Sequence, residues 1–154
     1  MATGYPDWVT PISIVAQALA ELVNRPAYGV PKTLFFGETV APNTFKLVGS
    51  VTGKGMMYGG FIAWSSAGEC KNTEIELYLD GVLAIRYGPA ALLQAGLLNN
   101  GSCYIYLLNY DDVNKEFSIG FSYPITFETS LAVYIDTYND ANHSVTMRLL
   151  YALA

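Results

Sequence analysis

The feature that most constrains the fold is the pattern of residues 30–154, where short alternating runs are interrupted by Gly, Pro, Asn and Asp. Alternation of apolar and polar residues is typical of half-buried strands, and turn signals about every ten residues are typical of a sandwich or barrel. The runs are rich in Val, Ile, Thr, Tyr and Phe, which favour pleated surfaces. They predict nine strands, over residues 33–38, 44–52, 56–65, 73–79, 82–87, 103–110, 116–123, 131–138 and 144–151.

The clearest local prediction is a hairpin in the middle of this pattern. Residues 74–79 alternate between apolar and polar side chains, and residues 82–87 form the returning run. Between them Asp80 and Gly81 supply a two-residue turn, because Asp-Gly tolerates the positive φ angles that such turns need. A glutamate of the first strand is then expected to face Arg86 of the second.

The predicted strands are separated by one longer connection. Residues 89–96 begin with Pro and end with Gly, which favours a short helix or compact turn. Eight or nine strands with one such connection fit an all-β, antiparallel, jelly-roll-like β-sandwich, and a fibronectin-like sandwich is the alternative. We therefore expect one β-sandwich domain over residues 30–154.

Residues 1–29 have a different pattern and predict an N-terminal docking arm. Apolar residues at helical spacing and Pro11 at a first helical position favour a helix, although the alternation of residues 12–22 also fits an extended strand. In either form the segment needs a surface to lie against. The side chains that we expect to anchor it are Tyr5, Trp8, Ile12, Val15, Leu19 and Leu22.

The composition predicts that part of the surface is covered by a partner. Apolar residues make up 52% of the chain and charged residues 14%, whereas the usual charged share is about 25%. Monomers also avoid large exposed apolar patches. Self-association is the interpretation that we favour; the alternative is a compact monomer whose surface is rich in Tyr, Ser and Asn.

Charge and hydropathy indicate which partners to expect. The net charge is −5 and the eight Lys and Arg form no basic stripe, so we expect no nucleic-acid partner. No run approaches the roughly 20 apolar residues of a membrane span. No secretory signal is visible at the start of the sequence, so we expect synthesis in the cytoplasm without a signal peptide. Cys70 and Cys103 are compatible with one disulfide or with two buried free thiols.

No residue pattern points to catalysis or to a cofactor. His143 is the only histidine, and Asp136, Asp140 and Ser144 lie near it in the sequence. Because residues 139–142 read as a turn, we expect an exposed turn histidine rather than a triad. We therefore predict no catalytic residue, no metal site, no cofactor and no enzyme activity.

Two further groups of residues have competing interpretations. Asp111 and Asp112 with Asn114 offer oxygen ligands for calcium, but Asp and Asn also dominate turns, and we favour the turn. The twelve tyrosines suit a protein interface, and a surface that binds glycans is the second interpretation. The tyrosines placed on predicted strands are Tyr78, Tyr87, Tyr104, Tyr106, Tyr110 and Tyr123.

Three stretches of the sequence resemble small structural proteins of tailed bacteriophages and prophages. They are the Tyr5-Pro6-Asp7-Trp8 opening with the run over residues 16–29, the Gly-rich block over residues 53–60, and the Leu-Asp-Gly-Val hairpin. The resemblance implies a virion component of the capsid decoration, fibre or adsorption type. It further implies a homotrimer or larger assembly, contact with other structural proteins of the particle, and a location in the virion or another extracellular assembly.

Overall fold

The computed structural model describes residues 28–98, 104–122, 124–138 and 141–154. The arm predicted over residues 1–29 lies almost entirely outside these ranges, and so do all six of its anchor residues, Tyr5, Trp8, Ile12, Val15, Leu19 and Leu22. Cys103, Tyr123 and Asp140 also lie outside the described residues.

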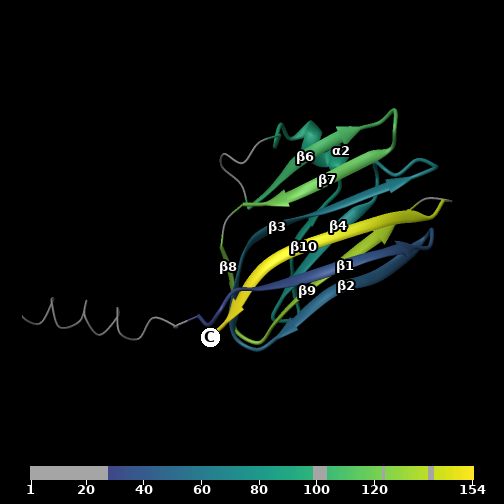
Figure 1. Ribbon diagram of the computed structural model, residues 1–154. Coiled ribbons are helices and arrows are strands. Elements are labelled where there is room, and N and C mark those ends of the chain that lie inside the picture. Colours follow the sequence, from purple (N-terminus) through teal and green to yellow (C-terminus); the bar gives the residue numbers. More distant parts are fainter. Residues whose placement is uncertain (1–27, 99–103, 123, 139–140) are drawn as a thin grey trace, which may run out of the picture.

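Two antiparallel sheets stack face to face, as Figure 1 shows. The larger has the order β1-β10-β3-β7-β6, with β8 paired to β3, and the smaller has the order β2-β9-β4-β5. Within the described residues no helix has the length and hydropathy to cross a bilayer. The elements are β1 (Lys32–Val40), β2 (Thr44–Thr52), β3 (Gly55–Ser66), β4 (Glu74–Leu79), β5 (Val82–Tyr87), α2 (Pro89–Gln94), β6 (Ile105–Asp111), β7 (Glu116–Phe121), β8 (Ile125–Phe127), β9 (Ser130–Thr137) and β10 (His143–Leu153).

The strand pairing identifies the sandwich as a jelly roll. β7 and β8 together pair with β3, so they occupy one strand position. The pairs β1·β10, β2·β9, β3·β7/β8 and β4·β5 are then nested one inside another along the chain. A nested antiparallel ribbon that is folded over so that its pairs alternate between two sheets is the jelly-roll arrangement. β6 is an extra strand at the edge of the larger sheet.

The predicted strands correspond closely to observed ones. The ranges 44–52 and 82–87 match β2 and β5, and the short helix after Pro89 is present as α2. The prediction that a strand runs over residues 116–123 was wrong at its end, because β7 stops at Phe121 and the separate strand β8 follows. Pro124 is the last residue of this short break and cannot donate a backbone hydrogen bond to a neighbouring strand.

The core lies between the sheets and is built by strict alternation. In β9 the inward side chains of Leu131, Val133 and Ile135 are fully buried, and the residues between them are partly exposed. Trp64 of β3 is buried beside Phe117 of β7, and its indole N–H donates to the carbonyl oxygen of Cys70 over 3.2 Å. Burial of these apolar side chains is the main force that holds the two sheets together.

The hairpin between β4 and β5 is confirmed, and its aspartate has a second role. Asp80 and Gly81 both have positive φ, 55° and 80°. The Asp80 carboxylate also accepts the backbone N–H groups of Glu128, Thr129 and Ser130, at 2.7 to 3.1 Å. These bonds lower the pKa of Asp80 to about 2. The turn is therefore joined to the connection between β8 and β9, a contact that local sequence does not predict.

Candidate functional site: outer faces and edges of the sandwich

The prediction that His143 is an exposed turn residue was wrong. His143 is the first residue of β10 and is fully buried. Its Nδ1–H donates to the carbonyl oxygen of Ala141 and its Nε2 accepts the Thr73 hydroxyl, both over 2.9 Å. Asp136 belongs to the other sheet, and Ser144 points to the opposite side of β10. Asp136 and Ser144, the candidate partners that the structure describes, therefore do not assemble with His143 into a catalytic triad.

Burial of His143 predicts a pH-dependent stability. Desolvation lowers its pKa from 6.5, so below about pH 6.5 the unfolded chain binds a proton that the folded chain resists, and stability falls as the pH falls. At about pH 5.5 we expect this single group to cost up to about 1.4 kcal/mol relative to pH 7.5. Urea denaturation of wild type and His143→Gln at both pH values measures the difference. Equal pH dependence in the two proteins would contradict it.

The acidic turn after β6 is a structural feature. Asp111 accepts the backbone N–H groups of Val113 and Asn114, each over 2.9 Å, as an Asx turn does. These bonds also lower the pKa of Asp111. The interpretation of these residues as a turn is confirmed. Within the described ranges, no group of three or more His, Cys, Asp and Glu is placed to hold a metal ion.

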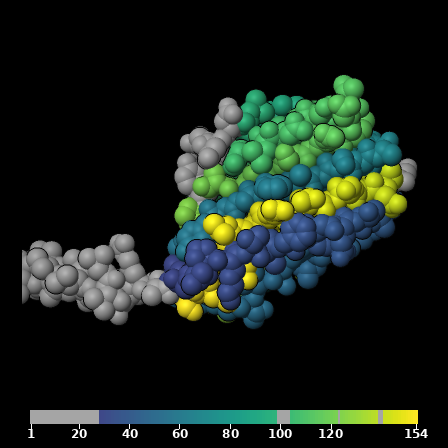
Figure 2. Space-filling view, in the orientation of Figure 1, coloured from purple at the N-terminus to yellow at the C-terminus, as the bar shows by residue number. Residues whose placement is uncertain are grey.

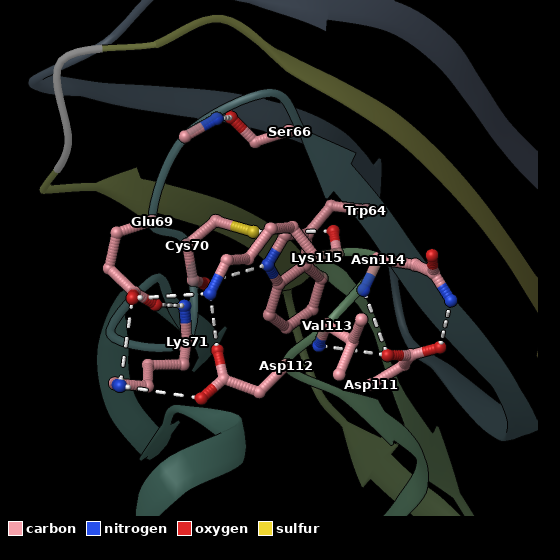
Figure 3. A network of polar contacts seen from close by, with 11 residues as sticks. Trp64, Ser66, Glu69, Cys70, Lys71, Asp111, Asp112, Val113, Asn114 and Lys115 are labelled. Carbon is pink, nitrogen blue, oxygen red and sulfur yellow. Dashed lines mark hydrogen bonds and ion pairs between the residues drawn. The ribbon is translucent and has the colours of Figure 1, made fainter.

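A network of ion pairs connects this turn to the loop between β3 and β4, as Figure 3 shows. Lys115 lies 2.6 Å from Asp112 and 3.4 Å from Glu69, and Lys71 contacts the same two carboxylates. Beneath them Cys70 carries a buried free thiol, and burial raises its pKa to about 11. A thiol with a raised pKa is a poor nucleophile. The ion pairs therefore join the turn after β6 to the loop between β3 and β4.

On the outer face of the six-stranded sheet, one set of cross-strand neighbours forms a row that runs across the strands rather than along them. Phe35 lies opposite Arg148, which lies opposite Phe61. Phe61 lies opposite Gly120, and Gly120 lies opposite Tyr106. These five residues form a row across β1, β10, β3, β7 and β6. Figure 2 shows these strands side by side as bands of different colour. We call Phe35, Arg148, Phe61, Gly120 and Tyr106 the aromatic row.

Two contacts fix the rings and the cation of the aromatic row. A Cβ atom at Gly120 would lie 2.4 Å from Cζ of Tyr106, so the ring of Tyr106 lies directly over the backbone of β7. At the other end, the Arg148 guanidinium lies 5.5 Å from the centre of the Phe35 ring, a cation–π distance. The Tyr106 ring and the stacked Phe35 and Arg148 groups therefore lie along the sheet, with one face of the planar groups directed toward solvent.

A hollow lies on each side of the aromatic row. The larger has a volume of about 510 Å³, and Gly59 and Gly60 line it together with residues of the row. The smaller has a volume of about 250 Å³. It lies over Thr146, Ala63 and Ser118, which are cross-strand neighbours in the next row of the sheet. The absence of large side chains at these positions makes the face concave on both sides of the rings.

The outer face of the smaller sheet is filled by contacts within the chain. Glu76 of β4 is only 4% exposed although it points away from the core. The Tyr78 hydroxyl donates to it over 2.8 Å and Arg86 approaches to 3.3 Å, which confirms the predicted pairing of Arg86 with a glutamate of β4. Beside them Phe45 and Tyr134 stack with ring centres 4.6 Å apart.

The four edges of the two sheets differ in how they are protected. Between β1 and β2, Lys46 lies 3.1 Å from Glu38 and 5.2 Å from the Phe36 ring centre. At β6, Leu107 donates a backbone hydrogen bond to Leu97 over 2.8 Å. Charges and an additional segment of chain therefore cover three of the edges.

The fourth edge, β5, is less protected among the described residues, where Tyr104, Pro124 and Ile125 lie across a hollow from Ala84 and Ile85. Val82, Leu83 and Tyr87 are 68%, 42% and 40% exposed. Its one charge, Arg86, is turned toward the neighbouring strand, where it lies 2.6 Å from Glu74. We call residues 82–87 the β5 edge. Exposed apolar edge strands are the positions at which another strand pairs most readily.

The described tyrosines lie on different parts of the sandwich. Tyr106 belongs to the aromatic row, Tyr78 packs on the smaller sheet, and Tyr110 packs its ring against Phe117 at the core boundary. These three tyrosines therefore do not share one surface. The aromatic row was missed because its members are far apart in sequence and only their register brings them together.

Comparison with known proteins gives no family assignment. No protein-family model matches the chain, and no curated protein matches it. A structure of infectious bursal disease virus, Gx strain, aligns with 82% of this chain and 32% of its own, at 12% identity and a TM-score of 0.46. The VP2 subviral particle of the same virus aligns with 84% of this chain and 44% of its own, at 10% identity and a TM-score of 0.27. The chain thus spans less than half of either matched chain.

Proposed function

We propose that this chain is a non-enzymatic structural subunit that assembles with copies of itself through the β5 edge. The observation that supports this proposal is the contrast between edges. Lys46 with Glu38 occupies one side of the sandwich, whereas Val82, Leu83 and Ala84 expose uncharged apolar side chains on the other. Proteins that remain monomeric place charges, prolines or bulges on such strands.

Pairing between two β5 edges would satisfy both the backbone and the side chains. An edge strand presents unpaired N–H and C=O groups, and an antiparallel partner supplies matching groups. Two copies joined in this way would form one sheet of eight strands from two sheets of four. The contact would also remove from water the exposed surfaces of Val82 and Leu83, which favours association.

The proposed setting is a virion, where the chain would be a capsid decoration or tail-fibre component. The support for this setting is the sequence resemblance to bacteriophage structural proteins. Residues 1–29 would provide a second contact, with Tyr5 and Trp8 as aromatic anchors on a neighbouring subunit. The described chain begins beside the end of β10, where Gly29 donates to the carbonyl oxygen of Leu153 over 2.7 Å.

Light scattering coupled to size-exclusion chromatography tests the proposal. We expect wild type to have a mass that is a multiple of 16.8 kDa. Val82→Lys places a charge on the β5 edge and should weaken association at least about tenfold. Trp8→Ala tests the contribution of the arm in the same measurement.

Val113→Lys is the matched control, because Val113 is 89% exposed but lies in the turn between β6 and β7. It should assemble as wild type does. A monomeric wild type at all concentrations would refute self-association. Equal assembly of Val82→Lys and wild type would instead refute the role of the β5 edge.

A further inference from the structure

The aromatic row has the properties of a ligand-binding surface rather than of a packing surface. Phe35 is 58% exposed, although Leu34 and Phe36 on either side of it pack against the core. Tyr106 lies over Gly120, a position where any other residue would displace the ring. Rings held flat against a sheet present a broad apolar face to solvent. The apolar face of a pyranose ring, made of C–H groups, stacks on such surfaces.

The cation of the row is available to a ligand. Arg148 forms no ion pair with any residue that the structure describes, and its guanidinium lies over the Phe35 ring. Stacking on a ring leaves the edge of the guanidinium free, and its N–H groups match the two oxygens of a carboxylate. The described cations that do contact a carboxylate are Lys46, Lys54, Lys71, Arg86 and Lys115.

The hollows beside the rings add space and polar groups. The larger hollow, of about 510 Å³, contains Arg148, Phe61 and Tyr106 in its lining, and ligand pockets are commonly about 300–1,000 Å³. The smaller hollow, on the other side of the row, is lined by the hydroxyl groups of Ser118 and Thr146. A linear ligand crossing the row would therefore find space and hydrogen-bonding groups on both sides of the rings.

We propose that the outer face of the six-stranded sheet binds an acidic carbohydrate across the aromatic row. Tyr106 and Phe61 would stack against sugar rings, and Arg148 would pair with a sugar carboxylate. A nucleic acid is disfavoured because Arg148 is the one cation in the lining of either hollow. A small carboxylate without a ring would leave the aromatic surfaces unused. This function does not depend on assembly through β5, which belongs to the other sheet.

Calorimetric titration of the full chain with three acidic oligosaccharides tests the proposal. The probes are a tetramer of galacturonic acid, a hyaluronan tetrasaccharide and sialyllactose. We expect binding to at least one of them, weakened at least about tenfold in Arg148→Gln because a charge-assisted pair is lost. Tyr106→Ala should weaken binding of both the acid and its methyl ester, whereas Arg148→Gln should leave the weaker binding of the ester unchanged.

Lys32→Gln is the control for charge, because Lys32 lies on β1 but does not line either hollow. It should bind as wild type does, and the melting temperature of each variant reports whether it is folded. Binding to none of the three probes would overturn the proposal, and so would binding that neither variant changes. Equal binding of an Asp-Glu peptide would identify a peptide surface instead. Val82→Lys should bind normally, which separates this result from failure of assembly.

Discussion

Gly60→Ala should leave little folded protein, although it adds a single methyl group. Gly60 has a φ of 143°, which side chains rarely adopt, and it lies in the middle of β3. A Cβ atom there would lie 2.1 Å from the carbonyl oxygen of Arg148 and 2.8 Å from Cα of Leu149. Both are backbone atoms of β10, so neither moves without disturbing the longest pairing of the sheet.

The expected loss is about 3 kcal/mol or more of the free energy of unfolding, from strain and overpacking together. A small domain has only about 5–15 kcal/mol in total. Urea denaturation followed by circular dichroism measures the loss. Gly96→Ala is the matched control, because Gly96 has a φ of 70° but no atom within 4 Å of the added Cβ. It should cost about 1–2 kcal/mol, and equal losses in the two variants would show that the β10 contact is unimportant.

Phe117→Ala should strongly destabilise the fold, because it removes a large ring from the core. Phe117 is 1% exposed and packs between Trp64, with ring centres 6.3 Å apart, and Tyr110, with ring centres 5.0 Å apart. Removing its ring leaves a cavity between the sheets, because the large rings of Trp64 and Tyr110 cannot both move into the space that Phe117 vacates. Comparable substitutions cost about 3–5 kcal/mol, which urea denaturation will measure.

Phe35→Ala deletes the same atoms from the outer face and provides the comparison. Phe35 contacts Arg148 but is more than half exposed, so its loss should change the free energy of unfolding by no more than about 0.5 kcal/mol. A large loss in Phe35→Ala would mean that the aromatic row holds the fold together. A small loss in Phe117→Ala would mean that the core relaxes around the missing ring.

Much of the fold was predictable because its signals are local. The alternation in residues 131–138 identifies β9, and Asp80 with Gly81 identifies the hairpin turn, since each depends only on neighbouring residues. The jelly roll was predicted as the leading fold and is confirmed by the nested strand pairs. The anchors predicted over residues 1–29 lie outside the described residues and stay a prediction.

The errors occurred where a distant segment changes the environment of a residue. The sequence predicts a turn before His143 and hence an exposed side chain, but Thr73 and the sandwich core enclose the imidazole. β8 has only three residues, too few for an alternating pattern, and exists because Gly55 to Met57 of β3 offer it a partner. The bonds from Asp80 to the Glu128–Ser130 connection were equally invisible in the sequence.

By itself, the sequence determined most of the strands, the turn between β4 and β5, and which side of an alternating strand such as β9 faces the core. The tertiary structure decided which strands lie side by side and in what register. That register places Phe35, Arg148, Phe61, Gly120 and Tyr106 in one row, and it places β5 at the edge of the four-stranded sheet. The physical reason is that turn chemistry and alternation act between neighbours in the chain. Register instead depends on burying all the apolar faces at once, a condition that no single segment contains.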